Sequence, residues 1–402
     1  MSLNQNNMPK YFLFLLTFSF IAASIEVEIS VPGFPEMAKY FNVSESVIQL
    51  TIAYNFLGYA IAAFFYGPLS DNYGRRKMMM IGNGVLMLGA LGTAYAAIIP
   101  NIYLLLAFRF IQGLGASTAA VVGSAMIMDI YKGNQSVTIV GIMNAVLTLL
   151  IASAPVIGGF INIAIGWQGN YWVVALITVL TWFLLLFLLP ETKHNRDIFN
   201  LKKLLKNYKN LFVHQAFLFT SLAPTLIYAA YMAFISSASF LYVDTIGLSV
   251  LTYSIHQACI IAVFCLTSFL SGLVNQCIGN RASIFVGQTI TLTGALCLLI
   301  VSWILPFSAY GITASMLLFS CGFAISYPVV YASSMEMFPE IKGTASSAII
   351  GLRAFVVSLY VALNGYFFDG QTYQLALMFF LAVAGGFILF CTILKLRFIT
   401  NK

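Results

Sequence analysis

The stretch GPLSDNYGRRK occupies residues 67–77 and lies between two apolar runs, at about 46–68 and 78–98. Each run holds on the order of 20 residues, the length at which an α-helix crosses the hydrocarbon core of a bilayer. The stretch itself carries one acidic residue, Asp71, followed by the basic cluster Arg75–Lys77. This pattern predicts two membrane-spanning helices joined by a short, positively charged loop.

Apolar runs of this kind recur along the whole chain. Of the 402 residues, 61% are hydrophobic and 8% are charged, whereas a soluble domain carries roughly 25% charged residues. Lipid must therefore cover much of the surface, and helices are expected there because they satisfy their own backbone hydrogen bonds. We predict an all-α integral membrane protein with twelve transmembrane helices. The predicted spans lie at about 11–31, 46–68, 78–98, 102–128, 137–163, 170–190, 213–240, 249–273, 282–304, 309–332, 343–367 and 373–396.

The basic residues predict the orientation of the chain. All but three of the 19 Lys and Arg residues fall on one side of the predicted topology, the exceptions being Lys39, Arg109 and Arg353. Because cytoplasmic loops are enriched in Lys and Arg, we predict a multi-pass protein of the cytoplasmic (inner) membrane with both termini in the cytoplasm. The basic residues form no single face despite the net charge of +7, so no nucleic-acid partner is expected.

One long polar segment, residues 191–212, divides the chain into two parts of equal helix number. We predict an N-terminal six-helix bundle in residues 1–190, a cytoplasmic basic linker in 191–212 and a C-terminal six-helix bundle in 213–402. The linker includes LKKLLKNYKNLF at 201–212, which is typical of a basic amphipathic helix lying on an anionic membrane surface. The alternative is a binding site for a soluble partner.

A weak internal repeat supports the division into two halves. Gly67 and Gly74 follow the second predicted helix, and Gly272 and Gly279 follow the eighth at the same spacing. In both places a basic residue comes soon after, Arg281 in the second half. Such repeats are typical of transporters built from duplicated bundles.

The loop at 67–77 closely resembles the signature of the major facilitator superfamily in the loop after its second helix. Residues Arg109–Gly115 (RFIQGLG) are similar to its R-x-x-Q-G-x-G element, and Ala154–Gly159 (APVIGG) resembles the antiporter element of its twelve-helix drug:proton antiporters. Residues Glu28–Pro35 (EISVPGFP) resemble the D-x-Y-L-P-A-L-P stretch of the Bcr/CflA subgroup, and Trp167 falls where that subgroup has GWRW. The resemblance covers nearly the whole chain and implies that superfamily's fold of two pseudo-symmetric six-helix bundles.

Two departures from these patterns concern the substrate. The antiporter element usually begins Gly-Pro and here begins Ala154-Pro155. The acid of the first helix is Glu28 rather than Asp, a second acid stands at Glu26, and Ser30 replaces the Tyr of the subgroup. The resemblance therefore implies no particular substrate range.

Charged side chains within the predicted spans are the first candidates for a functional site, because each costs at least ~2.5 kcal/mol at mid-helix. We expect Glu26, Glu28 and Arg109 to face a central cavity or to pair with one another. Glu26 and Glu28 point roughly 200° apart on a helix, so we expect one to face the cavity and the other to lie near the outer mouth or to be neutralised. Burial favours the protonated form of a carboxyl group, and our hypothesis makes Glu28 or Glu26 the proton-coupling acid, with Glu28 favoured, and Arg109 its partner. The alternative is that these charges only hold two helices together.

The loop at 67–77 predicts a conformational latch. Gly67 permits close helix packing, and Gly74 permits a tight turn. Asp71 is expected to cap the next helix or to pair with a basic residue across the interface between the halves. We expect Asp71 and Arg75 to close this side in the outward-open state, with Arg76 as a further cation of the loop. The alternative is a turn whose charges only set the topology.

The fifth predicted helix carries a bend signal. Pro155 removes a backbone hydrogen bond, and Gly158 and Gly159 allow a neighbouring helix to approach closely. We interpret this segment as a hinge and seal between the halves. Small-residue packing without a moving role is the alternative.

A central cavity is expected between the halves, lined by polar and aromatic side chains. Arg353 is expected either to bind an anionic group of the substrate or to pair with a carbonyl, which leaves anionic and zwitterionic substrates open. His256 is expected to be a proton relay or a polar residue at a helix end. The candidate lining residues are Tyr54, Asn55, Gln112, Tyr228, Tyr231, His256, Gln257, Tyr327, Tyr331 and Arg353.

These features predict a proton-coupled secondary transporter that exports small amphipathic drugs or metabolites by alternating-access antiport. Its expected partners are a small-molecule substrate, protons and the lipid bilayer, and we expect a monomer. The sequence has neither a P-loop nor a metal-spaced His or Cys cluster, so we expect no enzyme activity, cofactor or metal. Two alternatives stay open: a dedicated importer or exporter of one metabolite (an amino acid, nucleoside or siderophore), and a non-transporting membrane receptor on the same scaffold.

Overall fold

A computed structural model of the chain describes residues 8–9, 11–131, 134–193 and 200–395. Residues 194–199 of the predicted linker and the two ends of the chain lie outside the described residues. Within the described part, twelve helical segments are long and apolar enough to cross a membrane, which confirms the predicted all-α, twelve-span class. The prediction of separate units at 1–190 and 213–402 stays a prediction.

The helices follow the predicted spans closely. In the first half they are α1 Phe12–Glu28, α2 Phe34–Phe41, α3 Glu45–Tyr73, α4 Arg75–Ala96, α5 Ile102–Thr118, α6 Ser124–Ile130, α7 Asn134–Ile165 and α8 Gln168–Leu188. After α9, Leu201–Val213, come α10 Gln215–Ser239, α11 Val250–Ile278, α12 Asn280–Ile304, α13 Ala309–Glu336, α14 Lys342–Phe367 and α15 Thr372–Lys395. Short turns of 3-10 helix at Val31–Gly33 and Pro339–Ile341, and of π-helix at Ala119–Gly123 and Phe240–Thr245, connect some of them.

The first span is longer than its sequence predicts. The prediction ends it at residue 31, whereas the chain continues through the 3-10 turn Val31–Gly33 into α2 and reaches Phe41. Pro32 and Pro35 stand at the first positions of these two elements, where a proline ring is tolerated because its missing N–H would have no helical partner.

The joints between α3 and α4 and between α11 and α12 are equivalent. Gly74 has a φ of +100° and Gly279 a φ of +79°, and each ends a helix of 29 residues. A positive φ favours glycine because a Cβ would clash with the backbone. The tight turn predicted at Gly74 is therefore present, and the weak repeat of the sequence corresponds to a repeated structural joint.

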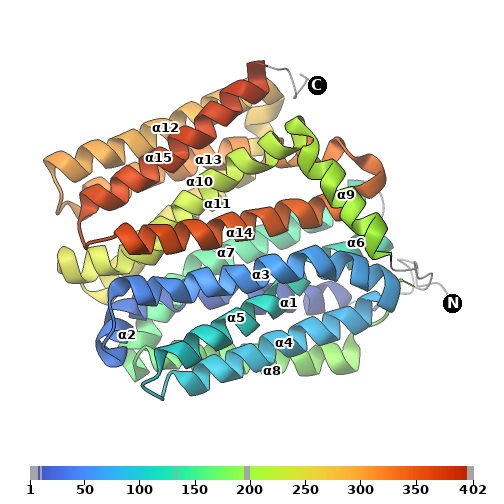
Figure 1. Cartoon of the computed structure of the whole chain (residues 1–402), viewed down its shortest axis with the longest axis horizontal. Helices are drawn as coiled ribbons and strands as arrows, with labels where there is room; N and C mark the ends of the chain where they lie inside the picture. Colours follow the sequence, from blue (N-terminus) through green and yellow to red (C-terminus); the bar gives the residue numbers. More distant parts are fainter. Residues whose placement is uncertain (1–7, 10, 132–133, 194–199, 396–402) are drawn as a thin grey trace.

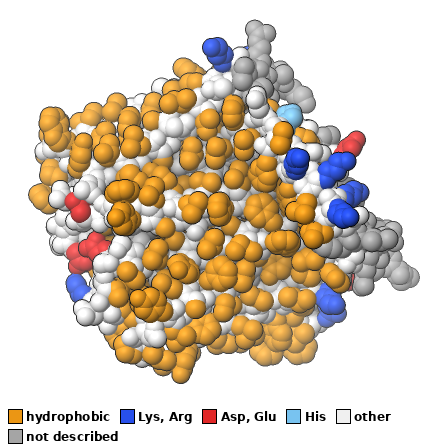
Figure 2. Space-filling view, in the orientation of Figure 1, with side chains coloured by type: hydrophobic (Ala, Val, Ile, Leu, Met, Phe, Trp, Pro, Cys, Tyr) orange, Lys and Arg blue, Asp and Glu red, His pale blue; other side chains and the backbone are white. Residues whose placement is uncertain are grey.

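The long helices run side by side, so that the molecule has two ends (Figure 1). At one end α1 begins, α15 ends and α9 lies across the neighbouring helix ends; we call it the α9 end, and the opposite one the far end. Lys and Arg side chains gather mainly at the α9 end and Asp and Glu side chains mainly at the far end, with a broad hydrophobic surface between them (Figure 2). This distribution is typical of a protein whose middle is covered by lipid.

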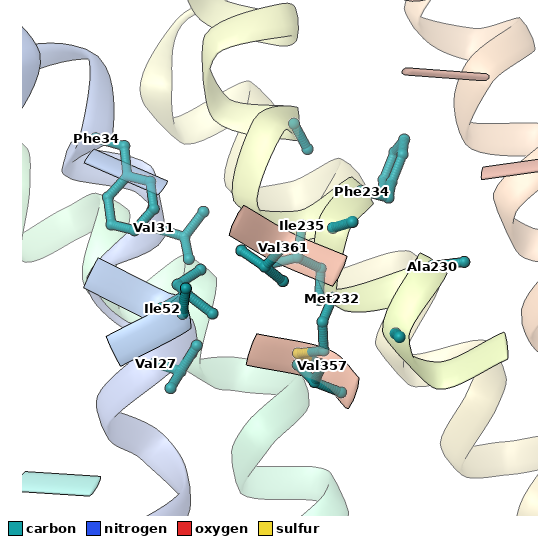
Figure 3. Packing of buried hydrophobic residues seen from close by; sticks show 14 of the residues in the cluster. Val27, Val31, Phe34, Ile52, Ala230, Met232, Phe234, Ile235, Val357 and Val361 are labelled. Carbon is teal, nitrogen blue, oxygen red and sulfur yellow. The ribbon is translucent and has the colours of Figure 1, made fainter. Parts of the chain in front are cut away.

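The two halves meet along two helix pairs. α3 of the first half packs against α14 of the second, and α7 packs against α11. One buried apolar cluster spans this interface, with Val27 and Ile52 from the first half facing Met232, Val357 and Val361 from the second (Figure 3). Buried apolar packing therefore connects the two halves in this region.

Helices α3 and α5 approach so closely that Gly113 has no room for a side chain. A Cβ on Gly113 would lie 1.9 Å from the carbonyl oxygen of Asn55. We predict that Gly113→Ala lowers the free energy of unfolding by roughly 1–3 kcal/mol, because the backbones must move apart. The measurement is the thermal unfolding of the purified protein in detergent micelles. Gly272→Ala is the matched control, since a Cβ there meets nothing within 4 Å; equal midpoints for the two variants would contradict the prediction.

Candidate functional site

A cavity of about 220 Å³ lies between the halves, near the middle of the spans. Helices α1, α3 and α7 line it from the first half, and α10 and α14 line it from the second. The lining residues are Ala23, Ser24, Glu26, Val27, Glu28, Asn55, Phe56, Tyr59, Ile151, Tyr228, Met232, Ile350, Arg353 and Ala354. Apolar and aromatic side chains thus form most of the wall, with a few charged and polar groups among them.

Glu26 and Arg109 are brought together, as the charge pattern of the sequence predicts. Glu26 is 2% exposed, and its Oε2 lies 4.0 Å from Nη1 of Arg109, whose side chain is completely buried. The Oε1 of Glu26 accepts a hydrogen bond of 3.0 Å from Nδ2 of Asn55. Arg109 Nη1 donates to Oε1 of Gln112 at 3.1 Å, and its guanidinium lies 5.9 Å from the ring centre of Tyr171. The contact between the two charges is loose, and Nε and Nη2 of Arg109 donate no hydrogen bond among the described residues.

Glu28 lies in the same cavity wall, so the expected separation of the two acids is wrong. Its side chain is 5% exposed, and its Oε2 accepts no hydrogen bond from the described residues. The two carboxyl groups do diverge around α1, but the cavity borders most of the last turn of that helix, from Ala23 to Glu28. A direction difference of roughly 200° therefore still leaves both in contact with one space.

Arg353 faces this cavity from α14 of the second half. Its Nη1 donates a hydrogen bond of 2.6 Å to the hydroxyl of Tyr327, and its guanidinium lies 5.3 Å from the ring centre of Tyr228. Both partners are uncharged side chains of the second half. The cavity wall therefore carries two acids on one side and one guanidinium on the other.

The other expected lining residues fall into two groups. Asn55 and Tyr228 lie in the wall, and Tyr327 lies behind it, bonded to Arg353. Gln112 is bonded to Arg109, which is itself outside the wall. Outside the wall, Tyr231 stacks on Phe319, the Tyr331 hydroxyl is 3.4 Å from Ser346 Oγ, and Gln257 is buried with both amide atoms unpartnered among the described residues.

Two further expected lining residues, Tyr54 and His256, also lie outside the wall. Tyr54 is 40% exposed and shares the outer face of α3 with Ile61 and Phe65, because a position next to Asn55 points about 100° away from it on a helix. His256 is also outside this cavity wall. Its Nδ1 lies 2.8 Å from the hydroxyl oxygen of Thr313, among aromatic rings near the beginning of α11.

Sequence reasoning missed the apolar part of the wall, which includes Phe56, Tyr59, Ile151 and Met232. These residues sit in apolar runs that look alike on every face. A usable signal exists for Tyr59, which is four positions from Asn55 and so on the same face of α3. Ile151 stands four positions before Pro155, which lacks the N–H that would bind its carbonyl.

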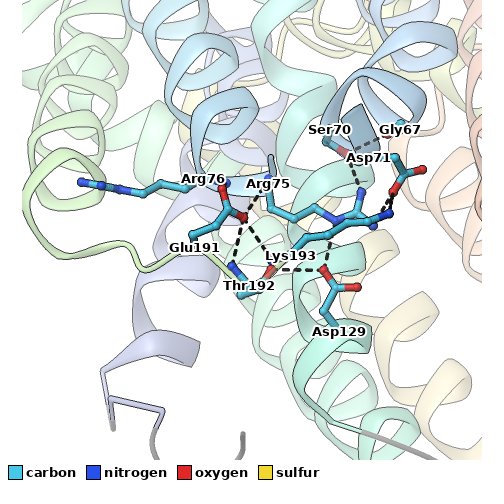
Figure 4. Close-up of polar contacts among 9 residues, drawn as sticks. All are labelled: Gly67, Ser70, Asp71, Arg75, Arg76, Asp129, Glu191, Thr192 and Lys193. Atoms are coloured by element: carbon cyan, nitrogen blue, oxygen red, sulfur yellow. Dashed lines mark hydrogen bonds and ion pairs between the residues drawn. The ribbon is translucent and has the colours of Figure 1, made fainter. Parts of the chain in front are cut away.

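At the α9 end, the loop residues form a network with other first-half residues and with the first residues of the linker (Figure 4). Arg75 contacts Asp71 at 2.8 Å and Asp129 at 3.1 Å, and Lys193 of the linker also contacts Asp71 at 2.8 Å. Among the described residues, Asp71 therefore forms ion pairs with Arg75 and Lys193 and with no cation of the second half. Gly67 borders the other half, since a Cβ there would lie 2.9 Å from Ser347 Oγ of α14.

The residue that caps α4 also differs from the predicted one. Asp71 does not cap this helix; instead, Glu191 accepts hydrogen bonds from the backbone N–H groups of Arg75 at 2.9 Å and Arg76 at 3.2 Å. Sequence reasoning missed Glu191 because it lies 116 residues from Arg75, so no local pattern connects them.

In α7 the two glycines contact different partners. A Cβ on Gly158 would lie 2.2 Å from the carbonyl oxygen of Ile29, just after α1, and one on Gly159 would lie 2.5 Å from Ser254 Oγ of α11. The pair therefore lets α7 pack closely against the first helix and against the other half at once. The bending role of Pro155 stays a prediction.

The profile described as Major Facilitator Superfamily matches residues 16–362 of the chain. This protein belongs to the Major Facilitator Superfamily. Its relatives within that superfamily include a bicyclomycin resistance protein homolog of Haemophilus influenzae, 25% identical over 353 residues, which cover 87% of this chain and 88% of the relative. Multidrug resistance protein D of Escherichia coli is 26% identical, with 90% of each chain covered. The chloramphenicol resistance protein CraA of Acinetobacter baumannii is 26% identical, with 84% and 81% covered.

Solved structures show the same superfamily fold. The xylose transporter XylE from E. coli, in a partially occluded inward-open conformation, superposes with a TM-score of 0.76 over 97% of this chain and 98% of that chain, at 14% identity. A D-xylose-proton symporter superposes with a TM-score of 0.74 over 93% and 96%, at 16% identity. At these identities the likeness concerns the fold alone.

The cap on α4 gives a test of the network at the α9 end. We predict that Glu191→Ala lowers the free energy of unfolding by about 1 kcal/mol, because two N–H groups at the start of α4 lose a charged acceptor. Glu191→Gln keeps an acceptor oxygen and is expected to lose less. Thermal unfolding in detergent measures both, with exposed Glu340→Ala as the control. An unchanged midpoint for Glu191→Ala would show that the cap contributes nothing.

Proposed function

We propose that the protein is a proton-coupled antiporter that exports small amphipathic compounds by alternating access. One observation carries the proposal: two carboxyl groups of α1 line a cavity between the two halves, next to a completely buried arginine. Carboxyl groups inside a membrane are costly and typically mark proton or substrate pathways. The resistance names of the relatives support export rather than import.

We assign the exchange of protons to Glu28 and a positioning role to Glu26. Each acid has an Oε2 without a hydrogen-bond donor among the described residues. Glu26, however, accepts a hydrogen bond from Asn55 and pairs with Arg109, whereas no ion pair of Glu28 is present among the described residues. A protonated Glu28 is neutral and releases a cationic substrate, while the ionised carboxylate binds it. Proton entry from the outer side and release to the cytoplasm then drive the substrate outward.

The orientation follows from the charges at the α9 end. Besides Arg75–Lys77, the exposed face of α9 carries Lys202, Lys203, Lys206 and Lys209. We propose that this end faces the cytoplasm, that both termini lie there, and that α9 rests on the anionic inner leaflet of the cytoplasmic membrane. We propose a monomer as the working unit.

Alternating access requires the contacts between the halves at the far end to break. In the far-end part of α3, Gln49 Oε1 accepts hydrogen bonds from Ser236 at 3.2 Å and from Asn364 at 3.3 Å. Lys39 and Asp244 form an exposed ion pair of 3.1 Å between the halves at the same end. Because the described charge network around Asp71 and Arg75 includes no residue of the second half, we propose that the far end is closed and the α9 end is free to open in this conformation.

Neutral variants of the two acids test the proton coupling. We predict that Glu28→Gln reduces proton-driven transport to the level of empty vesicles, because an amide neither releases a proton nor holds a cation. Glu26→Gln is expected to reduce transport and also stability, since it leaves Arg109 unpaired. The substrate is first found by screening compounds in a strain that lacks its major efflux pumps.

Transport is then measured in everted vesicles as the loss of the proton gradient when that compound is added. Glu36→Gln serves as the control, because Glu36 lies at the far end and contacts Asn162 instead of the cavity. Proton-dependent transport at the wild-type rate in both the Glu28 and the Glu26 variants would overturn the proposal.

A further inference from the structure

The positive charge of Arg353 is not balanced by a nearby carboxylate in the described part of the chain. Among the described residues, no Asp or Glu oxygen lies within the 4.0 Å that defines an ion pair with this guanidinium. Its near partners are the Tyr327 hydroxyl and the Tyr228 ring, which orient the guanidinium but carry no charge. Arg109, which lies within another span, has Glu26 beside it.

An unbalanced guanidinium inside a membrane protein is expensive. A cation at mid-helix costs at least ~2.5 kcal/mol, and such residues usually pair with an acid or face a binding site. Hydrogen bonding and a cation–π contact offset part of this cost. The planar fork of N–H groups remains suited to a carboxylate or phosphate group, which it binds through two parallel hydrogen bonds.

Glu28 is an acidic residue on the opposite side of the same cavity. It comes from α1 of the first half, and its Oε2 is buried without a hydrogen-bond donor among the described residues. One carboxyl group and one guanidinium therefore face a single space from different halves, and neither is paired with the other within 4.0 Å. Between them the wall is apolar and aromatic, with Phe56, Tyr59 and Met232.

We propose that the cavity selects small amphipathic zwitterions: the cationic group of the substrate binds Glu28, and its carboxylate or phosphate binds Arg353. This inference rests on the proposed function and names the substrate class of the same site. The cavity of about 220 Å³ is smaller than the ~300–1,000 Å³ typical of pockets for drug-sized ligands, which favours compounds of metabolite size. Such a substrate bridges the two halves. A proton competes with its cationic group for Glu28 and does not compete for Arg353.

Three matched probes separate the two charges of the ligand. Phenylalanine is the zwitterion, phenylalanine methyl ester keeps only the cation, and N-acetylphenylalanine keeps only the anion. Binding of each to the purified full chain is measured by the shift of its thermal unfolding at a range of concentrations. We expect the zwitterion to bind at least tenfold more tightly than either derivative, which corresponds to about 1.4 kcal/mol.

Two variants of Arg353 test its part in this preference. Arg353→Gln still reaches Tyr327 but has no charge, and it is expected to weaken zwitterion binding at least tenfold while leaving binding of the ester unchanged. Arg353→Lys keeps the charge but loses the fork, and it is expected to restore part of the affinity. The unchanged ester affinity shows that the variants are folded.

The proposal is overturned if the ester binds as tightly as the zwitterion, if Arg353→Gln weakens both equally, or if none of the three probes binds. These outcomes are distinct from failure of the proposed function, which is judged by Glu28→Gln in everted vesicles. A chain that prefers zwitterions but transports without protons would refute the antiporter and keep the substrate class. A proton-coupled exporter that prefers the ester would keep the antiporter and refute the substrate class.

Discussion

The charge pair of Arg109 and Glu26 is the constraint on which the first half depends. A completely buried guanidinium in the membrane interior is costly, and here a negative partner and hydrogen-bond acceptors lie close to it. Asn55 joins the pair, since its amide donates to Glu26 and also lies 3.4 Å from the carbonyl oxygen of Arg109. Helices α1, α3 and α5 are therefore held in one arrangement around the cavity by a single polar cluster.

That cluster exists only because the backbones of α3 and α5 come very close. Gly58 on α3 faces the carbonyl oxygen of Phe110, and Gly113 on α5 faces that of Asn55, each at a distance that excludes a Cβ. In lipid, helices associate through van der Waals packing and interhelical hydrogen bonds rather than through the hydrophobic effect, so small residues at such crossings are decisive. The glycines thus place Asn55 within reach of both charges.

The two halves contribute opposite charges to the cavity, and this asymmetry connects binding to movement. Acids come from α1 in the first half, and the guanidinium comes from α14 in the second. A ligand that contacts both charges interacts with both halves at once. Its binding energy therefore depends on how the halves are placed, which is the differential interaction that a ligand needs in order to shift a conformational equilibrium.

The sequence by itself determined the twelve spans, the sided distribution of basic residues, the turn at Gly74 and the set of costly charges within the spans. Each follows from local composition, because lipid requires long apolar helices and the energetic cost of a charge in lipid does not depend on the fold. Only the tertiary structure decided the partners: Glu191 as the cap of α4, Glu28 in the same cavity as Glu26, Tyr54 on the outer face, and the apolar wall at Phe56 and Met232. These contacts join residues far apart in the chain, and uniformly apolar helices carry no periodic signal to show which face meets a neighbour and which meets lipid.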